Sequence, residues 1–206
     1  MPKWVMVIDL NRCAGCNACS IACKYENSVP IGMFWRRTIT ISEGEYPGQR
    51  IEIIPRPCMM CENAPCVSVC PTGASYYDED GLVQIDYKKC IGCKYCIAAC
   101  PYGARQYNYT KQEEKPFHNP DVPKRPKGVV EKCTFCKHRL KRGDYKNTEH
   151  GRLGRMTACA QICPTGATWF GDLEDPNSQV AKLIKSGRAF QLLSWLGTKP
   201  RVYYLK

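Results

Sequence analysis

Cysteine is the residue type in this sequence with the clearest capacity for chemistry. The chain has 206 residues, of which 16 are cysteines. A cysteine content this high is typical of a disulfide scaffold or of metal binding. The cysteines fall into four groups of four: Cys13, Cys16, Cys19 and Cys23; Cys58, Cys61, Cys66 and Cys70; Cys90, Cys93, Cys96 and Cys100; and Cys133, Cys136, Cys159 and Cys163.

The spacing within the groups favours [4Fe–4S] clusters. The first and third groups read Cys-x2-Cys-x2-Cys-x3-Cys, which is the spacing of bacterial ferredoxins. The second group lengthens one interval, and a long insertion splits the fourth between Cys136 and Cys159. Three cysteines in one tight loop must all point at one cubane cluster. Small residues such as Ala14 and Gly15 let the backbone approach that cluster. In such ferredoxins the fourth cysteine of a run binds the other cluster.

Disulfides and zinc are the alternative uses of these cysteines. Cysteines separated by two residues are poorly suited to bond each other, and a disulfide framework would not repeat this triplet. Zinc sites usually take two well-separated pairs of ligands, and a zinc protein with this charge would suit a nucleic-acid partner. The triplets fit neither arrangement well, so we expect iron–sulfur clusters and no nucleic-acid partner.

The charge of the chain is strongly basic, with 30 Lys and Arg against 19 Asp and Glu and a formal net charge of +11. By itself this balance suggests nucleic acid or an anionic membrane as partner. An oxidised [4Fe–4S] centre with its four thiolates carries about −2, so four centres bring about −8 and leave about +3. Six lysines lie beside cluster cysteines in the sequence, as such compensation predicts: Lys24, Lys88, Lys89, Lys94, Lys132 and Lys137.

No other pattern predicts chemistry on a substrate. The sequence has no glycine-rich phosphate loop and no Ser/His/Asp arrangement, and its three histidines are isolated. No stretch approaches the roughly 18 apolar residues that a membrane span needs. The N-terminal stretch does not resemble a signal peptide, so we expect no export signal in the chain itself. We therefore predict redox centres and no catalytic site.

Repeated flanks indicate which elements position the cysteines. Ile8-Asp9 precedes the first group as Ile85-Asp86 precedes the third, and Pro-x-Gly-Ala follows the second, third and fourth groups. Each copy predicts a strand, a cysteine loop, a short helix and a turn into another strand. The expected strands cover residues 4–9, 75–77, 82–86 and 168–170, and residues 78–81 form the turn of a hairpin.

The segments outside the cysteine groups predict other kinds of structure. Alternating isoleucines in residues 31–57 predict a β-hairpin. The segment 111–127 is rich in proline and charge and predicts a linker or a surface excursion. A helix is expected over 178–186, and Phe190, Leu193 and Leu196 suggest a second apolar stripe. We interpret 176–206 as a C-terminal helical tail that docks on the body or on a partner.

These motifs, together with the segment Cys133-Thr134-Phe135-Cys136-Lys137-His138-Arg139, carry a resemblance that covers nearly the whole chain. The sequence resembles the iron–sulfur subunits of dimethyl sulfoxide reductase-family molybdopterin oxidoreductases. It is similar to the small type found in polysulfide, thiosulfate, tetrathionate and arsenate reductases. The resemblance implies an α+β fold with two pseudo-twofold-related bacterial ferredoxin-like modules. One module would comprise 1–30 with 128–175 and the other 58–110, with the hairpin as an insertion.

The resemblance also implies how the cysteines are shared among four [4Fe–4S] clusters. In some nitrate-reductase-like relatives a tryptophan replaces a cysteine of the third group and a three-iron cluster results, whereas Cys93 is present here. The implied ligands are Cys13, Cys16, Cys19 and Cys163 for cluster 1; Cys23, Cys133, Cys136 and Cys159 for cluster 2; Cys58, Cys61, Cys66 and Cys100 for cluster 3; and Cys70, Cys90, Cys93 and Cys96 for cluster 4.

The function that the resemblance implies is a relay of single electrons. The partners would be a large catalytic subunit with a molybdenum or tungsten bis-pterin and, at the other end, a quinone-linked membrane anchor or a soluble donor. The complex would be a respiratory reductase of a sulfur or arsenic oxyanion. An alternative is a polyferredoxin-like carrier of a hydrogenase, formate or carbon monoxide dehydrogenase system. We expect the chain at the outer face of the cytoplasmic membrane, co-exported with its partner, or in the cytoplasm if that partner has no export signal.

Overall fold

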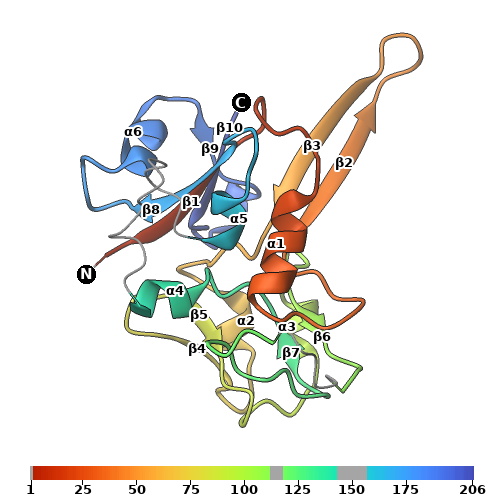
Figure 1. The fold of residues 1–206 in the computed structure, drawn as a ribbon, viewed down its shortest axis with the longest axis vertical. Coiled ribbons are helices and arrows are strands. Elements are labelled where there is room, and N and C mark those ends of the chain that lie inside the picture. The colour runs from red at the N-terminus through yellow and green to blue at the C-terminus, as the bar shows by residue number, and fades with distance from the viewer. Residues whose placement is uncertain (1, 112–117, 143–156) are drawn as a thin grey trace.

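A four-stranded sheet forms one end of the molecule (Figure 1). The computed structural model describes residues 2–111, 118–142 and 157–206. The strand order is β8-β1-β10-β9, where β1 pairs in parallel with β10 and antiparallel with β8. The strands are β1 (Trp4–Asp9), β8 (Thr168–Asp172), β9 (Ala189–Phe190) and β10 (Val202–Leu205). The expected first strand is confirmed, and it pairs with the strand that follows the fourth cysteine group.

Strand β1 is buried along its whole length because both faces of the sheet are covered. Side chains alternate across a strand, so Val5 and Val7 pack in one apolar cluster while Met6 and Ile8 pack in another. Helix α6 (Gln179–Lys185) covers the first of these faces with Val180, which is 1% exposed. The larger cluster on the other face contains many of the cysteines. The strand thus anchors the cysteine-rich part of the chain to a rigid sheet.

The C-terminal segment is less helical than the sequence suggested. Helix α6 confirms the expected helix, and the side chain of Ser178 caps it by accepting the Ala181 N–H at 3.2 Å. After it come β9, a single 3-10 turn at Ser194–Leu196 and β10. The prediction of a helical tail over 176–206 is therefore wrong in its second half. Pairing in parallel with β1 buries Val202, Tyr204 and Leu205, and this tertiary gain decides their conformation.

A long hairpin projects from the body (Figure 1). It consists of β2 (Arg37–Glu43) and β3 (Arg50–Arg56), paired antiparallel with Ile39 opposite Ile54. Most of its residues are exposed or half-buried. Its base is attached to the sheet, because the hydroxyl of Tyr204 donates to the Pro55 carbonyl at 3.0 Å.

Short elements hold the cysteine loops. The helices are α1 (Ala18–Glu26), α2 (Pro65–Ser68), α3 (Tyr95–Ala98), α4 (Lys137–Arg142) and α5 (Ala158–Gln161). Two strand pairs accompany them: β4 (Ser75–Tyr77) with β5 (Val83–Ile85), and β6 (Gln106–Tyr107) with β7 (Val130–Glu131). The Asp78 carboxylate accepts the N–H groups of Asp80 at 3.0 Å and Leu82 at 2.9 Å, which fixes the turn between β4 and β5.

The described part of the proline-rich segment 111–127 packs against the body; residues 112–117 lie outside the described residues. Arg125 is 3% exposed and donates to the Asn27 carbonyl at 2.7 Å and to the Tyr87 hydroxyl at 2.7 Å. Its guanidinium also lies over the Trp35 ring, 4.5 Å from the centroid. This segment consequently ties the end of α1 to the lead-in of the third cysteine group.

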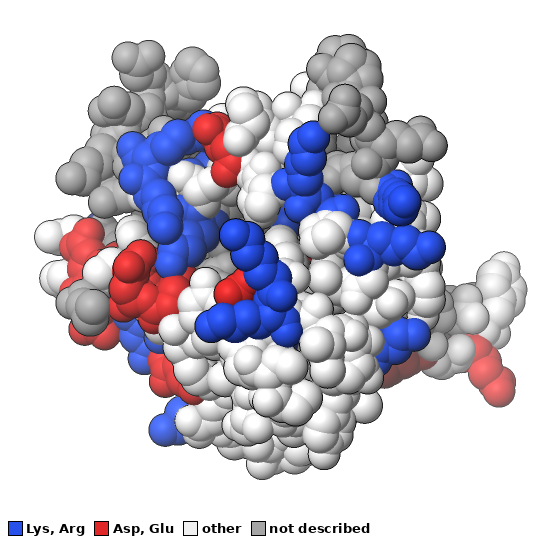
Figure 2. All heavy atoms as spheres, turned by 90° about the horizontal axis from the view of Figure 1, so that it is seen from below, with Lys and Arg blue, Asp and Glu red and all other residues white. Residues whose placement is uncertain are grey.

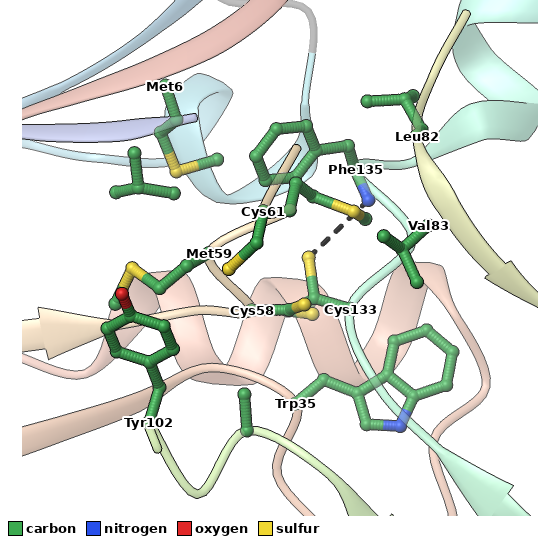
Figure 3. Close-up of a cluster of buried hydrophobic side chains, with 14 of the residues drawn as sticks. Met6, Trp35, Cys58, Met59, Cys61, Leu82, Val83, Tyr102, Cys133 and Phe135 are labelled. Carbon is green, nitrogen blue, oxygen red and sulfur yellow. Dashed lines mark hydrogen bonds between the residues drawn. The ribbon is translucent and has the colours of Figure 1, made fainter. Parts of the chain in front are cut away.

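Aromatic and sulfur-containing side chains fill the space between the sheet and the cysteine loops (Figure 3). Phe135, which lies between Cys133 and Cys136 in the sequence, meets Phe170 of β8 edge-on with the ring centroids 5.1 Å apart. Met59 and Met60 are 1% and 0% exposed. Among the helices of the described residues, none combines the length and the apolar character needed to cross a membrane.

Candidate metal centres

The described structure gathers the sixteen cysteines into four sets of four. Three sets line separate small hollows. The lining cysteines are Cys13, Cys16, Cys19 and Cys163 in the first hollow; Cys58, Cys61, Cys66 and Cys100 in the next; and Cys70, Cys90, Cys93 and Cys96 in the last. We call these places site 1, site 3 and site 4.

The remaining four cysteines form site 2, which is deeply buried. They are Cys23, Cys133, Cys136 and Cys159, between 4% and 6% exposed. Burial, and then the proximity of the other three thiols, raises the pKa of Cys23 well above its ordinary value. The side-chain amide of Asn27 lies 3.7 Å from Cys23 Sγ and 3.8 Å from Cys136 Sγ. Thiols from three distant parts of the chain therefore meet at this place.

Helices α1, α2, α3 and α5 each connect two sites. Helix α1 begins one residue before Cys19 of site 1 and contains Cys23 of site 2. Helix α5 likewise contains Cys159 of site 2 and ends two residues before Cys163 of site 1. The spacing of four residues places such a pair one turn apart on a helix. Helices α2 and α3 connect sites 3 and 4 in the same way through Cys66, Cys70, Cys96 and Cys100.

Residues with positive φ shape the cysteine loops before the helices begin. Gly92 lies in the loop of site 4 with φ +69°, and a Cβ there would come within 2.2 Å of the Gly128 carbonyl oxygen. Gly15 is its counterpart in site 1 with φ +68°. Asn17 and Lys94, each directly before a helix, also have left-handed backbone conformations. The loops combine tight backbone approach with conformations that glycine adopts most readily.

Backbone N–H groups point at several of the sulfur atoms. Ala167 donates to Cys163 Sγ at 3.2 Å, Ser75 to Cys70 Sγ at 3.4 Å and Phe135 to Cys133 Sγ at 3.4 Å. The last of these is drawn in Figure 3. Such hydrogen bonds hold ligand sulfurs in place and stabilise negative charge on them. They identify the Pro-Thr-Gly-Ala turns as parts of the sites.

The pKa values of the thiols separate into two classes. Burial raises the pKa of Cys61 and of Cys136 to about 12. At Cys70 and Cys163 burial also raises the pKa, but hydrogen bonds outweigh it and the pKa is lowered. The donors are the N–H of Ser75 and the Thr72 hydroxyl for Cys70, and the Thr165 hydroxyl and the Ala167 N–H for Cys163. Thiols with a raised pKa, such as Cys61 and Cys136, keep their protons unless metal cations replace them.

The arrangement fits a polynuclear cluster better than a single metal ion. Over residues 2–111, 118–142 and 157–206, no three Cys, His, Asp or Glu side chains converge on one ion. The thiols instead stand around hollows. Nε of Arg36 and both Nε and Nη2 of Arg105 have no hydrogen-bond partner among the described residues, although both side chains are buried. Sulfide ions and thiolates of iron–sulfur clusters are acceptors for such donors.

The buried cations at the sites were largely missed by the sequence reasoning. Of the six lysines noted beside cysteines, Lys132 is buried, at 1% exposure. Lys137 is instead paired with Asp78, 2.5 Å away, and Lys94 lies over the ring of Tyr107, 4.3 Å from its centroid. Arg36 and Arg105, 1% and 4% exposed, lie at the sites but were not predicted there. Arg36 lies directly before β2 and Arg105 directly before β6, after the Pro-x-Gly-Ala turn that follows Cys100, and neither position gave a signal beyond the basic composition.

Figure 2 views the end of the molecule that carries β4, β5, β6 and β7. Lys and Arg side chains gather across the middle of this face, and Asp and Glu lie mainly to one side. The basic excess of the sequence is thus distributed between the surface and the buried positions at the sites.

The two halves of the chain match the same class of protein. A family described as 4Fe-4S dicluster domain matches residues 49–173, and a second family of the same description matches residues 5–71. Together with the four sets of thiols, these matches show that the chain belongs to the 4Fe-4S dicluster proteins and carries [4Fe–4S] clusters.

Within that class, its relatives include iron–sulfur subunits of reductases. A Halobacterium salinarum protein named as the iron–sulfur subunit of a dimethyl sulfoxide reductase is 46% identical, over 100% of this chain and 79% of its own length. A subunit of the selenate reductase of Mesobacillus selenatarsenatis is 43% identical, over 98% and 72%. The arsenate respiratory reductase iron–sulfur subunit of a Shewanella strain is 39% identical, over 98% and 95%. The resemblance noted in the sequence is confirmed, and the chain belongs to the family of iron–sulfur subunits of such reductases.

Proposed function

We propose that this chain relays single electrons through four [4Fe–4S] clusters, one at each of sites 1 to 4. The observation that carries the proposal is the pairing of sites by α1, α2, α3 and α5, each of which connects thiols of two sites. The sixteen ligands would be the sixteen cysteines, with the membership of sites 1 to 4 given above. Each cluster supplies reversible one-electron chemistry.

The chain's own residues hold the sites close together and keep water from the inner ones. Every cysteine of site 2 is buried, and so are three of the four at site 3. The exposed cysteines are Cys16 at site 1 and Cys93 at site 4. Electrons would therefore enter and leave at the two ends, while the two inner sites stay insulated from solvent.

The partners proposed are a catalytic subunit and an electron donor. The relatives named above are subunits of dimethyl sulfoxide, selenate and arsenate reductases, which supports a large molybdenum or tungsten bis-pterin subunit as one partner. A quinone-linked membrane anchor or a soluble donor would be the other. The terminal substrate proposed is a sulfur or arsenic oxyanion.

The organisation proposed for the chain follows the cysteine groups. Residues 1–30 with 128–175 would form one ferredoxin-like module and 58–110 the other, related by a pseudo-twofold axis.

The outer face of the cytoplasmic membrane is the proposed location, reached by co-export with the catalytic subunit. Fractionation of cells of the source organism separates this location from the cytoplasm.

The test is to purify the complex from its source and follow electrons through it. A large bis-pterin subunit should co-purify, and a reduced donor should reduce that subunit only when this chain is present. Cys93→Ser should slow the transfer at least tenfold because it removes a ligand of an end site. Co-purification with a hydrogenase or a carbon monoxide dehydrogenase would instead favour the alternative carrier role.

A further inference from the structure

Three buried cations stand at the boundaries between the four sites. Arg36, Lys132 and Arg105 are 1%, 1% and 4% exposed. None of the three forms an ion pair with a carboxylate in the described part of the chain. A buried charge without a counter-charge is costly. The charges facing these cations are those of the cysteine sites.

Arg36 lies between sites 1 and 2. It lines the hollow of site 1 together with Cys19, and its Nη1 is 3.4 Å from Cys159 Sγ of site 2. Its Nη2 donates to the Thr168 hydroxyl at 2.9 Å, which fixes the guanidinium against β8. One rigid cation thus contacts the walls of two sites.

Arg105 occupies the equivalent place between sites 3 and 4. Its side chain lines both hollows, that of site 3 with Cys66 and that of site 4 with Cys96. Its Nη1 donates to the Ser75 hydroxyl at 2.7 Å. Ser75 in turn donates its backbone N–H to Cys70 Sγ of site 4.

Lys132 lies between the two inner sites. Its ammonium donates to the carbonyl of Cys133, which belongs to site 2, at 2.9 Å, and to the carbonyl of Val83, which lines site 3. The side chains of Cys133, Cys58 and Cys61 lie close together in the same region (Figure 3). The ammonium therefore stands where site 2 meets site 3.

Arg125 shows that burial of a cation in this chain does not by itself imply such a role. Its guanidinium is 3% exposed, but it stacks on Trp35 and donates to Asn27 and Tyr87. It also lies close enough to the Glu131 carboxyl to lower that group's pKa, against the larger effect of burial. Its guanidinium is therefore held by an aromatic face, a carbonyl oxygen and a hydroxyl group, whereas the three boundary cations face the cysteine sites.

We propose that Arg36, Lys132 and Arg105 are fixed positive charges, one at each boundary between consecutive sites, that raise the reduction potentials of the two clusters beside them. The proposal rests on the proposed function. A cluster with its four thiolates goes from about −2 to about −3 when it gains an electron, so a nearby cation favours the reduced form. The electron gained by one cluster is lost by its neighbour, and no bond or proton moves. Since each cation lies between two clusters, it stabilises an added electron on either of them.

The test is a redox titration of the full chain in its complex, followed by electron paramagnetic resonance. Arg36→Met should lower the potentials of the clusters at sites 1 and 2, and Arg105→Met those at sites 3 and 4. Lys132→Met should lower the potentials at sites 2 and 3. We expect the ratio of reduced to oxidised cluster at a fixed applied potential to fall at least tenfold, which is about 59 mV for one electron. A residue that merely stabilises the fold would not produce this pattern of pairs.

Matched variants separate charge from packing and hydrogen bonding. Arg36→Lys keeps the charge and should keep the potentials of both clusters, whereas Arg36→Gln keeps N–H donors without charge and should shift them as Met does. Lys89→Met removes an exposed lysine next to Cys90 and should change no ratio more than twofold, because solvent screens it. If Arg36→Met does not assemble, Lys132→Met and Arg105→Met still test the pattern.

Unchanged potentials in the methionine variants with full iron content, or equal shifts of all four clusters, would overturn the proposal. Restored potentials in Arg36→Gln would assign the effect to hydrogen bonds and overturn it as well. A different result would contradict the proposed function: a wild-type chain that holds fewer than four clusters or that does not reduce its partner.

Discussion

At the scale of single residues, the fold treats the sixteen thiols unequally. Burial raises the pKa of most affected thiols, for example Cys61 to about 12. In the Pro-Thr-Gly-Ala turns after Cys70 and Cys163, hydrogen bonds reverse the effect of burial and lower the pKa. N–H groups that point at sulfur stabilise its negative charge. The same donors should stabilise the reduced form of a cluster, which carries one more negative charge.

Asn27 offers a direct test of this effect at site 2. Its side-chain amide is buried and faces the sulfurs of Cys23 and Cys136. Asn27→Leu should lower the potential of one cluster because the N–H donors to its sulfurs are lost, and should destabilise the fold by about 1 kcal/mol through the lost hydrogen bond to the Cys23 carbonyl. Redox titration measures the first effect and thermal unfolding the second.

The control for Asn27 is Asn63→Leu, because Asn63 is exposed and its side chain donates to the Gly197 carbonyl at 3.0 Å. It should leave all four potentials unchanged. Equal shifts in both variants, or no shift in Asn27→Leu, would show that amide donors to sulfur do not set the potential at site 2.

At the scale of elements, the sites depend on very short helices and on loops with positive φ. Helices α2, α3 and α5 have four residues each, too few to be stable alone. Helix α1 is longer and is joined to α4 by Glu26, which accepts from His138 at 2.7 Å and from Arg139 at 2.6 Å. These two hydrogen bonds and the charge of the Arg139 guanidinium outweigh burial and lower the pKa of Glu26 to about 2. Tertiary contacts and the clusters themselves thus hold these elements in place.

Gly92→Ala tests whether the loop of site 4 needs its close backbone contact. A Cβ at this position would lie 2.2 Å from the Gly128 carbonyl oxygen and 2.9 Å from Tyr107 Cε2. The loop must move, so we expect loss of the cluster at site 4 and a fall of about four iron atoms per chain. Iron analysis of the purified variant measures this loss.

Gly187→Ala is the matched control, since Gly187 has φ +77° and open space around it. It carries the same kind of backbone strain, roughly 1–2 kcal/mol, without a clash. It should keep its full iron content. Equal iron loss in the two variants would mean that strain, rather than the contact with Gly128, limits cluster assembly.

Much of this architecture could be predicted because repeated local patterns dictate it. The lead-in strand β1, the strand pair β4 and β5 and the helix α6 follow from local sequence. The membership of β10 in the main sheet could not be read locally, because parallel pairing with β1 depends on residues almost the whole chain apart. Likewise Arg36 and Arg105 lie far in sequence from some of the cysteines they approach, and only folding brings them together.

At the scale of the whole molecule, basic residues compensate the negative charge of the clusters, both inside the fold and on its surface. The net charge of +11 is opposed by clusters of about −2 each. Part of that compensation is internal, in Arg36, Lys132 and Arg105, and part lies on the surface (Figure 2). The two end sites each have one exposed cysteine, Cys16 and Cys93, while the inner sites are enclosed. This arrangement suits a conductor of electrons between two partners.

The measurement that tests this account most directly is the metal content of the purified chain, combined with Mössbauer spectroscopy of iron-57-enriched protein. Four [4Fe–4S] clusters on sixteen cysteines predict about sixteen iron atoms and about sixteen acid-labile sulfides per chain, all in cubane clusters. About eight iron atoms, a three-iron cluster at site 4, or zinc in place of iron would contradict the account.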